Sequence, residues 1–193
     1  MKYLLFPLGN PGQKYTKTRH NAAQFVFSFL KKEEEFKKFL KEKDIEVFIS
    51  EGFMNESGKY LKKFIKNKNL ENENIIILYD DKDLEIGDIR LAKERGDGGH
   101  NGLKNIIESL STKEFPRIRI GIAPKGTGKN GLIPPHGEVV QKYVLGNMTE
   151  EEMDILSSKK VLERIIFFLN EIFKEAKIIK EQNNKQKTTH ECA

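Results

Sequence analysis

Short apolar runs alternate with longer stretches of helical periodicity over most of the chain. Apolar or alternating runs predict β-strands at residues 3–8, 45–49, 75–78, 87–91 and 118–122. Apolar positions that recur every three or four residues predict helices at residues 21–32, 57–66 and 103–111. Strands that alternate with helices are typical of a three-layer α/β fold, so we expect a single domain with a sheet flanked by helices.

The pattern changes after the last predicted strand. Residues 126–138 contain four glycines and two prolines and are predicted to form a mobile loop. Thr149 and Glu152 have the spacing of a capping box, and a long run of apolar positions at helical spacing follows them. The end of the chain is polar, so we expect a domain over residues 1–180 and a frayed tail over residues 181–193.

Composition narrows the class of protein. The 193 residues are 37% hydrophobic and 33% charged, with a formal net charge of +5. This balance fits a globular chain with a mild preference for polyanions. Cys192 is the only cysteine, which excludes a disulfide framework and a cysteine-based metal site. Because the sequence has neither a leader pattern nor an apolar segment of membrane length, we expect a cytoplasmic protein.

The segment GDGGHNGL at residues 96–103 is the most informative local pattern. Four glycines in seven residues permit tight or left-handed backbone, and His100 and Asn101 lie among them. A glycine loop that opens a helix presents free N–H groups suited to a phosphate, a carboxylate or an oxyanion. The alternative is a tight turn in which the glycines serve steric needs alone.

His20 and Asp80 are candidates for acid–base chemistry. A histidine titrates near neutral pH and suits a general base, although a surface histidine at a helix start has the same sequence pattern. Asp80 follows a predicted buried strand, where an aspartate either orients an imidazole or caps a turn. Together with Asp81 and Asp83 it suggests a metal site as an alternative, which we disfavour because no second cluster of ligands completes it.

Asn10, Asn55 and Asn101 form a third group of candidates. An uncharged amide both donates and accepts hydrogen bonds, which suits a site that holds a peptide backbone and polarises an ester carbonyl. Asparagine is also a common turn residue, and that alternative stays open for each of the three.

Three further segments, together with the glycine segment, closely resemble those of bacterial-type peptidyl-tRNA hydrolases. They are LGNPG at residues 8–12 followed by TRHN at 18–21, FMNESG at 53–58, and YDDKDL at 79–84. The resemblance runs in the expected order from about Leu4 to about Asn147. Four motifs at compatible spacings make it far more specific than a lone glycine pattern.

The resemblance implies a twisted mixed β-sheet flanked by helices. It also implies hydrolysis of the ester bond between a peptide and the 3′ ribose of tRNA, by which a cell recycles tRNA from prematurely released peptidyl-tRNA. We therefore expect a monomer that acts on peptidyl-tRNA with no metal and no other cofactor.

The same resemblance assigns roles to residues. His20 is the expected general base and Asp80 its partner, and Asn10 and Asn101 complete the expected catalytic set. The expected substrate-binding residues are Tyr15, Phe53, Met54, Asn55, Gly98, Asn101, Arg90 and Arg119. Arg90 and Arg119 match positions used for the tRNA end, and the basic residues Lys93, Arg95 and Arg117 lie nearby in the sequence. The lysines between residues 59 and 68 are interpreted as a solvated helix face.

Three residues depart from the family pattern. Pro7 replaces the usual glycine of the first strand and is awkward there, because proline cannot donate to a sheet. Tyr79 stands where a histidine is common, and Ala92 where a second lysine is often found. Two rival functions are a catalytically idle RNA-binding relative and an esterase or amidase for a small substrate. The missing Gly-x-Ser-x-Gly pattern weighs against the second.

Overall fold

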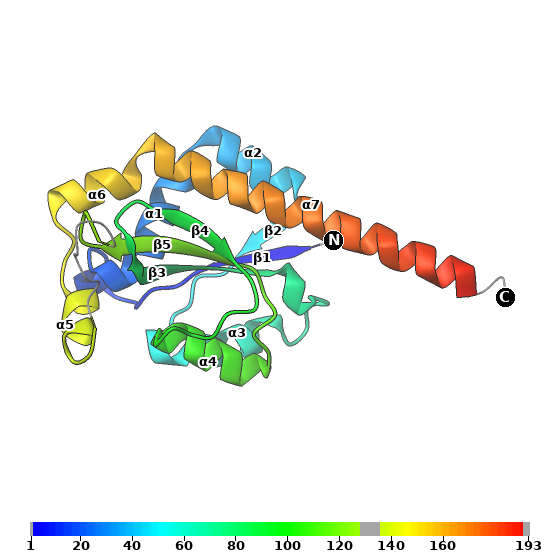
Figure 1. Cartoon of the computed structure of the whole chain (residues 1–193), viewed down its shortest axis with the longest axis horizontal. Helices are drawn as coiled ribbons and strands as arrows, with labels where there is room; N and C mark the ends of the chain where they lie inside the picture. The colour runs from blue at the N-terminus through cyan, green and yellow to red at the C-terminus, as the bar shows by residue number, and fades with distance from the viewer. Residues whose placement is uncertain (1, 128–135, 191–193) are drawn as a thin grey trace.

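The computed structural model of the chain describes residues 2–127 and 136–190 (Figure 1). The strands are β1 Tyr3–Pro7, β2 Ile45–Val47, β3 Ile75–Glu85, β4 Ile89–Ala92 and β5 Arg117–Ala123. They form one sheet in the order β2-β1-β3-β5-β4. β2, β1, β3 and β5 are parallel neighbours, and β4 runs antiparallel to β5. The expected mixed sheet is confirmed.

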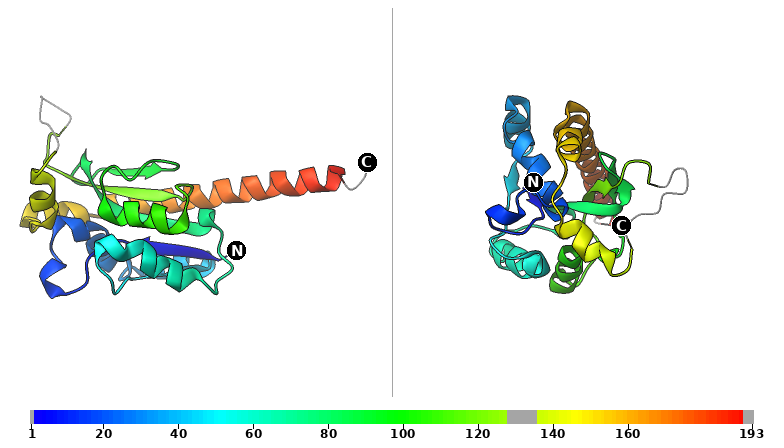
Figure 2. Two further views of the ribbon diagram at one scale, coloured as in Figure 1. Left: turned by 90° about the horizontal axis from the view of Figure 1, so that it is seen from below. Right: turned by 90° about the vertical axis from the view of Figure 1, so that its left-hand side faces the viewer.

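Helices cover both faces of this sheet and one of its ends. The α-helices are α1 Ala22–Leu30, α2 Glu34–Glu42, α3 Ser57–Ile65, α4 Asn101–Leu110, α5 Val139–Leu145, α6 Glu150–Ser157 and α7 Lys159–His190. The short 3₁₀ helices are η1 Gln13–Tyr15, η2 Arg19–Asn21, η3 Met54–Glu56 and η4 Asn72–Asn74. In Figure 1 and Figure 2, α1, α2, α6 and α7 form one layer, α3 and α4 form the opposite layer, and α5 lies at an end. The three-layer α/β fold is thereby confirmed.

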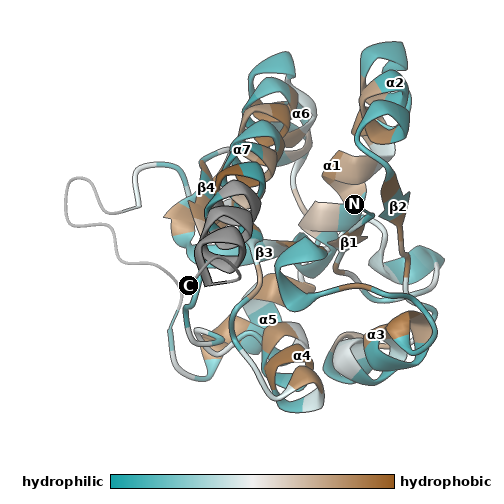
Figure 3. Ribbon diagram, turned by 90° about the vertical axis from the view of Figure 1, so that its right-hand side faces the viewer, coloured by the Kyte–Doolittle hydropathy of each residue, from teal (hydrophilic) through white to brown (hydrophobic). Residues whose placement is uncertain are grey.

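The central strands are buried on both sides, because alternate side chains face the two helical layers. Ile76 and Leu78 of β3 pack into the larger core with α1, α6 and α7. Ile75 and Ile77 pack into the smaller core with α3 and α4. Figure 3 shows hydrophobic positions on the helices turned toward the sheet. Burial on both faces explains why the central strands are continuous apolar runs in the sequence.

Pro7 is the last residue of β1 and costs the sheet no hydrogen bond. The Leu8 N–H donates to the Leu78 carbonyl of β3 (2.9 Å), whereas the Tyr3 N–H donates on the β2 side (3.0 Å). Alternation along the strand places the Pro7 nitrogen on the β2 side as well, where β2 has already ended at Val47. The proline is accommodated because its missing donor has no partner strand at that level.

The predicted end of the third strand is wrong. The sequence places it at residue 78, whereas β3 continues to Glu85. Asp80 therefore lies inside β3, paired with Ile120 of β5, and does not directly follow the strand. Pairing with β5 becomes irregular between Asp81 and Glu85. The charged residues of this stretch conceal the extension, because strand periodicity is recognised from apolar positions.

The C-terminal region also departs from the predicted pattern. The capping box of Thr149 and Glu152 is confirmed, with both of its hydrogen bonds present. The stretch of helical spacing that follows is divided at Ser158, whose extended backbone separates α6 from α7. α7 then continues to His190 and crosses the domain boundary expected at residue 180. The division into a domain and a tail at that residue stays a prediction.

Two helices are absent from the sequence-based prediction. α2 is short and mostly charged, with Phe36 as its buried residue, and α5 begins directly after the predicted glycine-rich loop. Residues 128–135 of that loop lie outside the described residues. Among the helices that are described, none is both long and apolar enough to cross a membrane.

Candidate active site

A cavity of about 540 Å³ opens where the parallel strands end. Its walls come from segments far apart in the sequence: the turn after β1, η2, η3, the polar half of β3, the glycine segment and α5. The lining residues are Asn10, His20, Met54, Asn55, Tyr79, Asp80, Asp81, Lys82, Asp83, Arg95, Gly96, Asp97, Gly98, Gly99, His100, Asn101, Gly137, Glu138, Val140, Gln141, Val144 and Leu145. Open α/β sheets bind ligands at this end of their strands.

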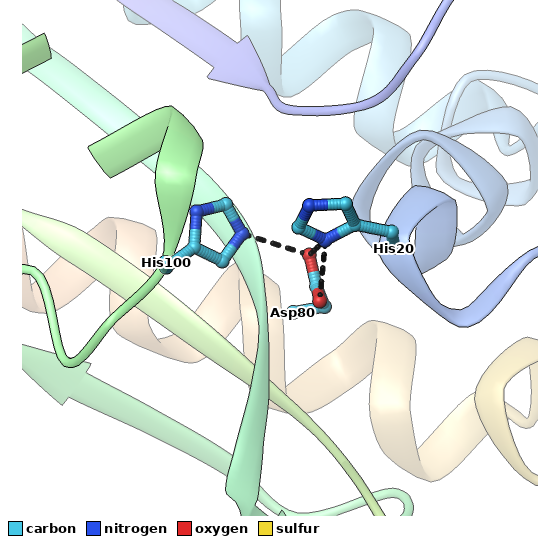
Figure 4. A group of neighbouring side chains, drawn as sticks. All are labelled: His20, Asp80 and His100. Carbon is cyan, nitrogen blue, oxygen red and sulfur yellow. Dashed lines mark hydrogen bonds and ion pairs between the residues drawn. The ribbon is translucent and has the colours of Figure 1, made fainter. Parts of the chain in front are cut away.

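His20 is buried in η2, and its ring faces Asp80 on β3 (Figure 4). Nδ1 lies 3.0 Å from Oδ1 and 2.9 Å from Oδ2 of the carboxylate. An ionised carboxylate only accepts hydrogen bonds, so Nδ1 carries a proton and Nε2 carries none in the neutral ring. Nε2 is thus the atom that can take a proton from a water molecule in the cavity.

His100 holds Asp80 from the opposite side (Figure 4). It is the N-cap of α4, where its Nδ1 accepts a hydrogen bond from the Leu103 N–H (3.2 Å). Nε2 therefore carries the proton of the neutral ring and donates it to Asp80 Oδ1 (2.9 Å). Sequence reasoning did not assign His100 to the site. Its position directly before Asn101, at the start of a predicted helix, was the available signal.

His20 and Asp80 shift each other's pKa values. Burial lowers the pKa of His20, but the charge of Asp80 and its hydrogen bond outweigh burial, so this pKa is raised above its ordinary value. Burial raises the pKa of Asp80, but His20 and His100 together hold it well below its usual range. Asp80 is therefore ionised at any working pH, and it stabilises the protonated form of His20.

Asn10 is oriented by two contacts that leave its amide nitrogen available. Its Oδ1 accepts from the Met54 N–H (2.8 Å). Its backbone is held by Asn21, which accepts from the Asn10 N–H (2.8 Å) and donates to the Asn10 carbonyl (2.9 Å). Because Oδ1 is occupied, Nδ2 is the group with which Asn10 can donate to a ligand in the cavity. Asn21, next to His20 in the sequence, was not predicted to take part.

The cavity brings together half of the predicted substrate-binding residues. Asn55, Met54, Asn101 and Gly98 line it, from η3, the glycine segment and the start of α4. Tyr15 and Phe53 do not line it. They form an edge-to-face aromatic pair with centroids 6.1 Å apart, and Phe53 is 48% exposed.

Tyr79, which stands where the family often has a histidine, packs against His100 in the structure. Its buried ring lies edge-on to the ring of His100, with centroids 5.2 Å apart. Burial, and then the charge of Asp81, raise the pKa of Tyr79 to about 12, so it stays a neutral phenol. Ala92 is buried opposite Arg117 in the sheet.

The predicted arginines have unlike surroundings. Arg90 lies on the edge strand β4 with its side chain 55% exposed. Arg119, its partner across the sheet, is buried and donates through Nε to Asp81 (2.7 Å). Arg117 is wholly buried, and its guanidinium donates to the carbonyls of Gly96 (2.9 Å) and Lys113 (3.0 Å). A guanidinium buried in this way does not offer its charge to a phosphate in this structure.

The predicted aspartate cluster does not converge on a common point. Asp81 is bound by Arg119, and Asp83 by Lys82 (2.7 Å). The potential ligands that do lie close together among the described residues are His20, Asp80 and His100, whose atoms fall within 4.8 Å of one another. A metal ion on Nε2 of His100 would force the proton onto Nδ1, which faces the Leu103 N–H donor. The hydrogen bonds of His100 therefore favour protons over a metal ion at this place.

Together the fold and the site define a class of protein. A histidine oriented by a buried carboxylate and surrounded by amide side chains suits the activation of water for hydrolysis. The described residues that line the cavity include no serine, threonine or cysteine to act as a nucleophile. The arrangement is that of a hydrolase with a three-layer α/β fold, whose site suits direct attack by water.

Comparison with known proteins identifies the family. The family model described as "Peptidyl-tRNA hydrolase" matches residues 4–191. A relative of that name from Prochlorococcus marinus (strain AS9601) is 38% identical over 197 aligned positions, which cover 93% of this chain and 94% of the relative. Another, from Thermodesulfovibrio yellowstonii, is 37% identical and covers 85% of this chain and 90% of the relative.

A solved structure supports the same family. The peptidyl-tRNA hydrolase from Acinetobacter baumannii has a TM-score of 0.71 and 30% identity, over 91% of this chain and 92% of that one. The chain therefore belongs to the peptidyl-tRNA hydrolase family, whose enzymes hydrolyse the ester bond of peptidyl-tRNA and release the tRNA.

Proposed function

We propose that the chain performs this hydrolysis with His20 as the general base, oriented by Asp80 and His100. The observation that carries the proposal is the pair of hydrogen bonds on Asp80, one from each imidazole. They fix the tautomer of both rings and leave Nε2 of His20 as the proton acceptor.

The reaction needs only water and side chains. Nε2 of His20 removes a proton from water as the water oxygen attacks the ester carbonyl carbon. The carbonyl oxygen becomes an oxyanion, for which Nδ2 of Asn10 and the amide of Asn101 are the candidate donors. His20 then returns its proton to the 3′ oxygen of the ribose as the carbon–oxygen bond breaks. The products are a peptide with a free carboxyl group and tRNA.

The peptide and the tRNA are assigned to different parts of the surface. Met54, Asn55 and Gly98 are proposed to contact the peptide and the ester within the cavity. Phe53 is proposed to contact the peptide beyond the cavity, and Tyr15 to lie close to the ester and the terminal nucleotide. These roles rest on the motif positions and on the cavity lining. Aromatic faces suit a base without reading its sequence.

Arg90 and Arg119 are proposed to contact phosphates of the tRNA end. Exposure and position on an edge strand support Arg90. For Arg119 the contact requires sharing a guanidinium that Asp81 already binds. Phosphate contacts of this kind add affinity and salt dependence without sequence preference.

The proposed cellular compartment follows from the substrate. Recycling of tRNA from prematurely released peptidyl-tRNA belongs to the compartment of translation, so we place the chain in the cytoplasm. We expect it to act there as a monomer and without a cofactor.

A turnover assay on peptidyl-tRNA, with aminoacyl-tRNA as the comparison substrate, tests the proposal. His20→Ala should lower turnover by roughly 10²–10⁴-fold, the usual contribution of a positioned base. Its circular dichroism spectrum and tRNA affinity should match those of the wild type. Full turnover by a folded His20→Ala protein would refute the base assignment, and no turnover by the wild type would favour an idle RNA-binding relative.

A further inference from the structure

The turn that carries His20 is attached to the connection between α5 and α6. The Arg19 N–H donates to the Gly146 carbonyl (3.1 Å), and the Met148 N–H donates to the Lys17 carbonyl (2.8 Å). An isolated antiparallel bridge joins the residues between these two bonds. The position of the proposed base therefore depends on a segment more than one hundred residues away in the sequence.

The side chain of Arg19 strengthens this attachment with a bidentate ion pair. Nε lies 3.0 Å from Oε1 of Glu152, and Nη2 lies 2.9 Å from Oε2. Both side chains are only 14% exposed. The guanidinium also lies over the ring of Tyr143 at 4.5 Å, and Nη1 approaches the Tyr143 carbonyl at 3.4 Å. Fork geometry and partial burial make this pair stronger than an ordinary surface ion pair.

Both partners of Arg19 belong to elements that shape the cavity or support its wall. Glu152 closes the capping box of α6 through the Thr149 N–H (2.7 Å). Tyr143 lies on α5, and its hydroxyl donates to the Ile122 carbonyl of β5 (2.5 Å). α5 supplies the apolar wall of the cavity through residues such as Val144. Arg19 thus connects the turn of the base, the α5 wall and the start of α6.

We propose that Arg19 is a positioning residue whose fork on Glu152 fixes His20 relative to Asp80 and to the α5 wall. The inference rests on the proposed role of His20 as the base. Arg19 does not line the cavity and touches no reacting atom. Its effect passes through the backbone of η2, where a small displacement of His20 changes its alignment with the attacking water.

Arginine and lysine differ in a way that separates positioning from charge. Arg19→Lys keeps the charge but has no planar fork for Glu152 and no flat group to cover Tyr143. Arg19→Met removes the charge and the fork. If Arg19 acted through charge alone, Arg19→Lys would be silent, and Arg19→Met would raise the pKa of His20 by removing a nearby cation. Loss of positioning lowers this pKa in both variants, because His20 moves away from Asp80.

The experiment measures kcat and KM on peptidyl-tRNA for Arg19→Lys, Arg19→Met and Glu152→Gln, and titrates His20 by proton NMR in each free protein. Thr149→Ala is the matched control, because it removes the capping hydrogen bond of α6 and leaves both atoms of the fork. We expect kcat to fall by about 10- to 100-fold in the Arg19 variants, with KM within about threefold, as a misplaced reacting group would give. Thr149→Ala should keep kcat within about threefold while lowering the melting temperature.

Two results would overturn the inference. One is an Arg19→Lys protein that has lost the bidentate ion pair with Glu152 and still keeps kcat within about threefold of the wild type. The other is a fall in kcat for Thr149→Ala equal to that for Arg19→Lys, since helix stability would then explain both. If the Arg19 variants do not fold, Glu152→Gln is used to test whether the fork positions His20. This substitution keeps the shape of the side chain and one acceptor oxygen. An active His20→Ala protein would refute the proposed function instead, and the NMR titration would still report whether Arg19 positions His20.

Discussion

Asp80 and Asp81 are neighbours on β3, both are buried, and both are ion-paired, yet their partners differ. Asp80 accepts from the imidazoles of His20 and His100. Asp81 accepts from the guanidinium of Arg119. An imidazole gains and loses a proton near neutral pH, whereas a guanidinium keeps its proton at any working pH.

Burial and charge therefore do not by themselves make a carboxylate suited to catalysis. Asp80 can influence a reaction because its partner His20 carries a ring that can gain and lose a proton. Asp81 can only hold Arg119 in place and contribute to the local electrostatic field. The two residues therefore invite matched substitutions that should have unlike effects.

The largest effect is expected from Asp80→Asn. The substitution keeps the shape but removes the charge that orients His20 and stabilises its protonated form, so kcat should fall by roughly 10³–10⁴-fold with little change in tRNA binding. Asp81→Asn is the control. It should keep kcat within about threefold and should lower the melting temperature, because it weakens a buried ion pair. Single-turnover kinetics and thermal unfolding measure both quantities. Equal losses of kcat in the two variants would remove the distinction.

A smaller effect is expected from His100→Asn. Asparagine is a good N-cap and can keep the hydrogen bond from the Leu103 N–H, but it is too short to donate to Asp80. With one of its two imidazole donors lost, Asp80 should orient His20 less well, and kcat should fall by about tenfold, the worth of about one hydrogen bond to a charged group. An unchanged kcat in a folded variant would show that His20 alone suffices to hold Asp80.

Arg90 and Arg119 extend the comparison to tRNA binding. Arg90→Ala should make the plot of log affinity against log salt shallower by about one unit, as expected for one lost phosphate contact. Arg119→Ala should change this slope less, because Asp81 already compensates its charge. Asn55→Ala should leave the slope unchanged and impair recognition of the peptide. Binding titrations at several salt concentrations test all three, and a larger slope change for Arg119→Ala would mean that Asp81 releases its partner on binding.

Removal of metal ions should have the smallest effect. After exhaustive chelation and dialysis, turnover should stay within about twofold, since the proposed chemistry uses only side chains and water. The tRNA must be folded beforehand, because its own structure responds to divalent ions. Activity that is lost and then restored by a divalent ion would show that His20, Asp80 and His100 bind a metal in the working enzyme.

The sequence predicted the central strands well, because their burial on both faces leaves continuous apolar runs. It failed where charged residues occupy a strand, as after Leu78, and where a helix is short and polar, as in α2. The same physical reason applies to both failures: periodicity is recognised from apolar positions, and these segments bury few apolar side chains.

The sequence identified the main residues of the site but few of the contacts between them. His20, Asp80, Asn10 and Asn101 were identified from motifs, and the structure brings them to one cavity. The second donor to Asp80 could not be inferred, because it depends on how the glycine segment folds back over β3. Nor could the link from Arg19 to Glu152, since a contact across 133 positions leaves no local pattern in one sequence.

The pH dependence of kcat/KM is the most direct test of His20 as a base tuned by Asp80, because it reports the ionisation of the free enzyme. His20 must be neutral to accept a proton, and Asp80 raises its pKa, so activity should fall toward acid with a midpoint above the ordinary histidine value of about 6.5. In Asp80→Asn the burial that lowers this pKa remains and the raising charge is gone, so the midpoint should move below that value. We expect this shift toward acid together with the lower rate. A wild-type midpoint below about 6.5, or the same midpoint in both proteins, would contradict the assignment of His20 as a base tuned by Asp80.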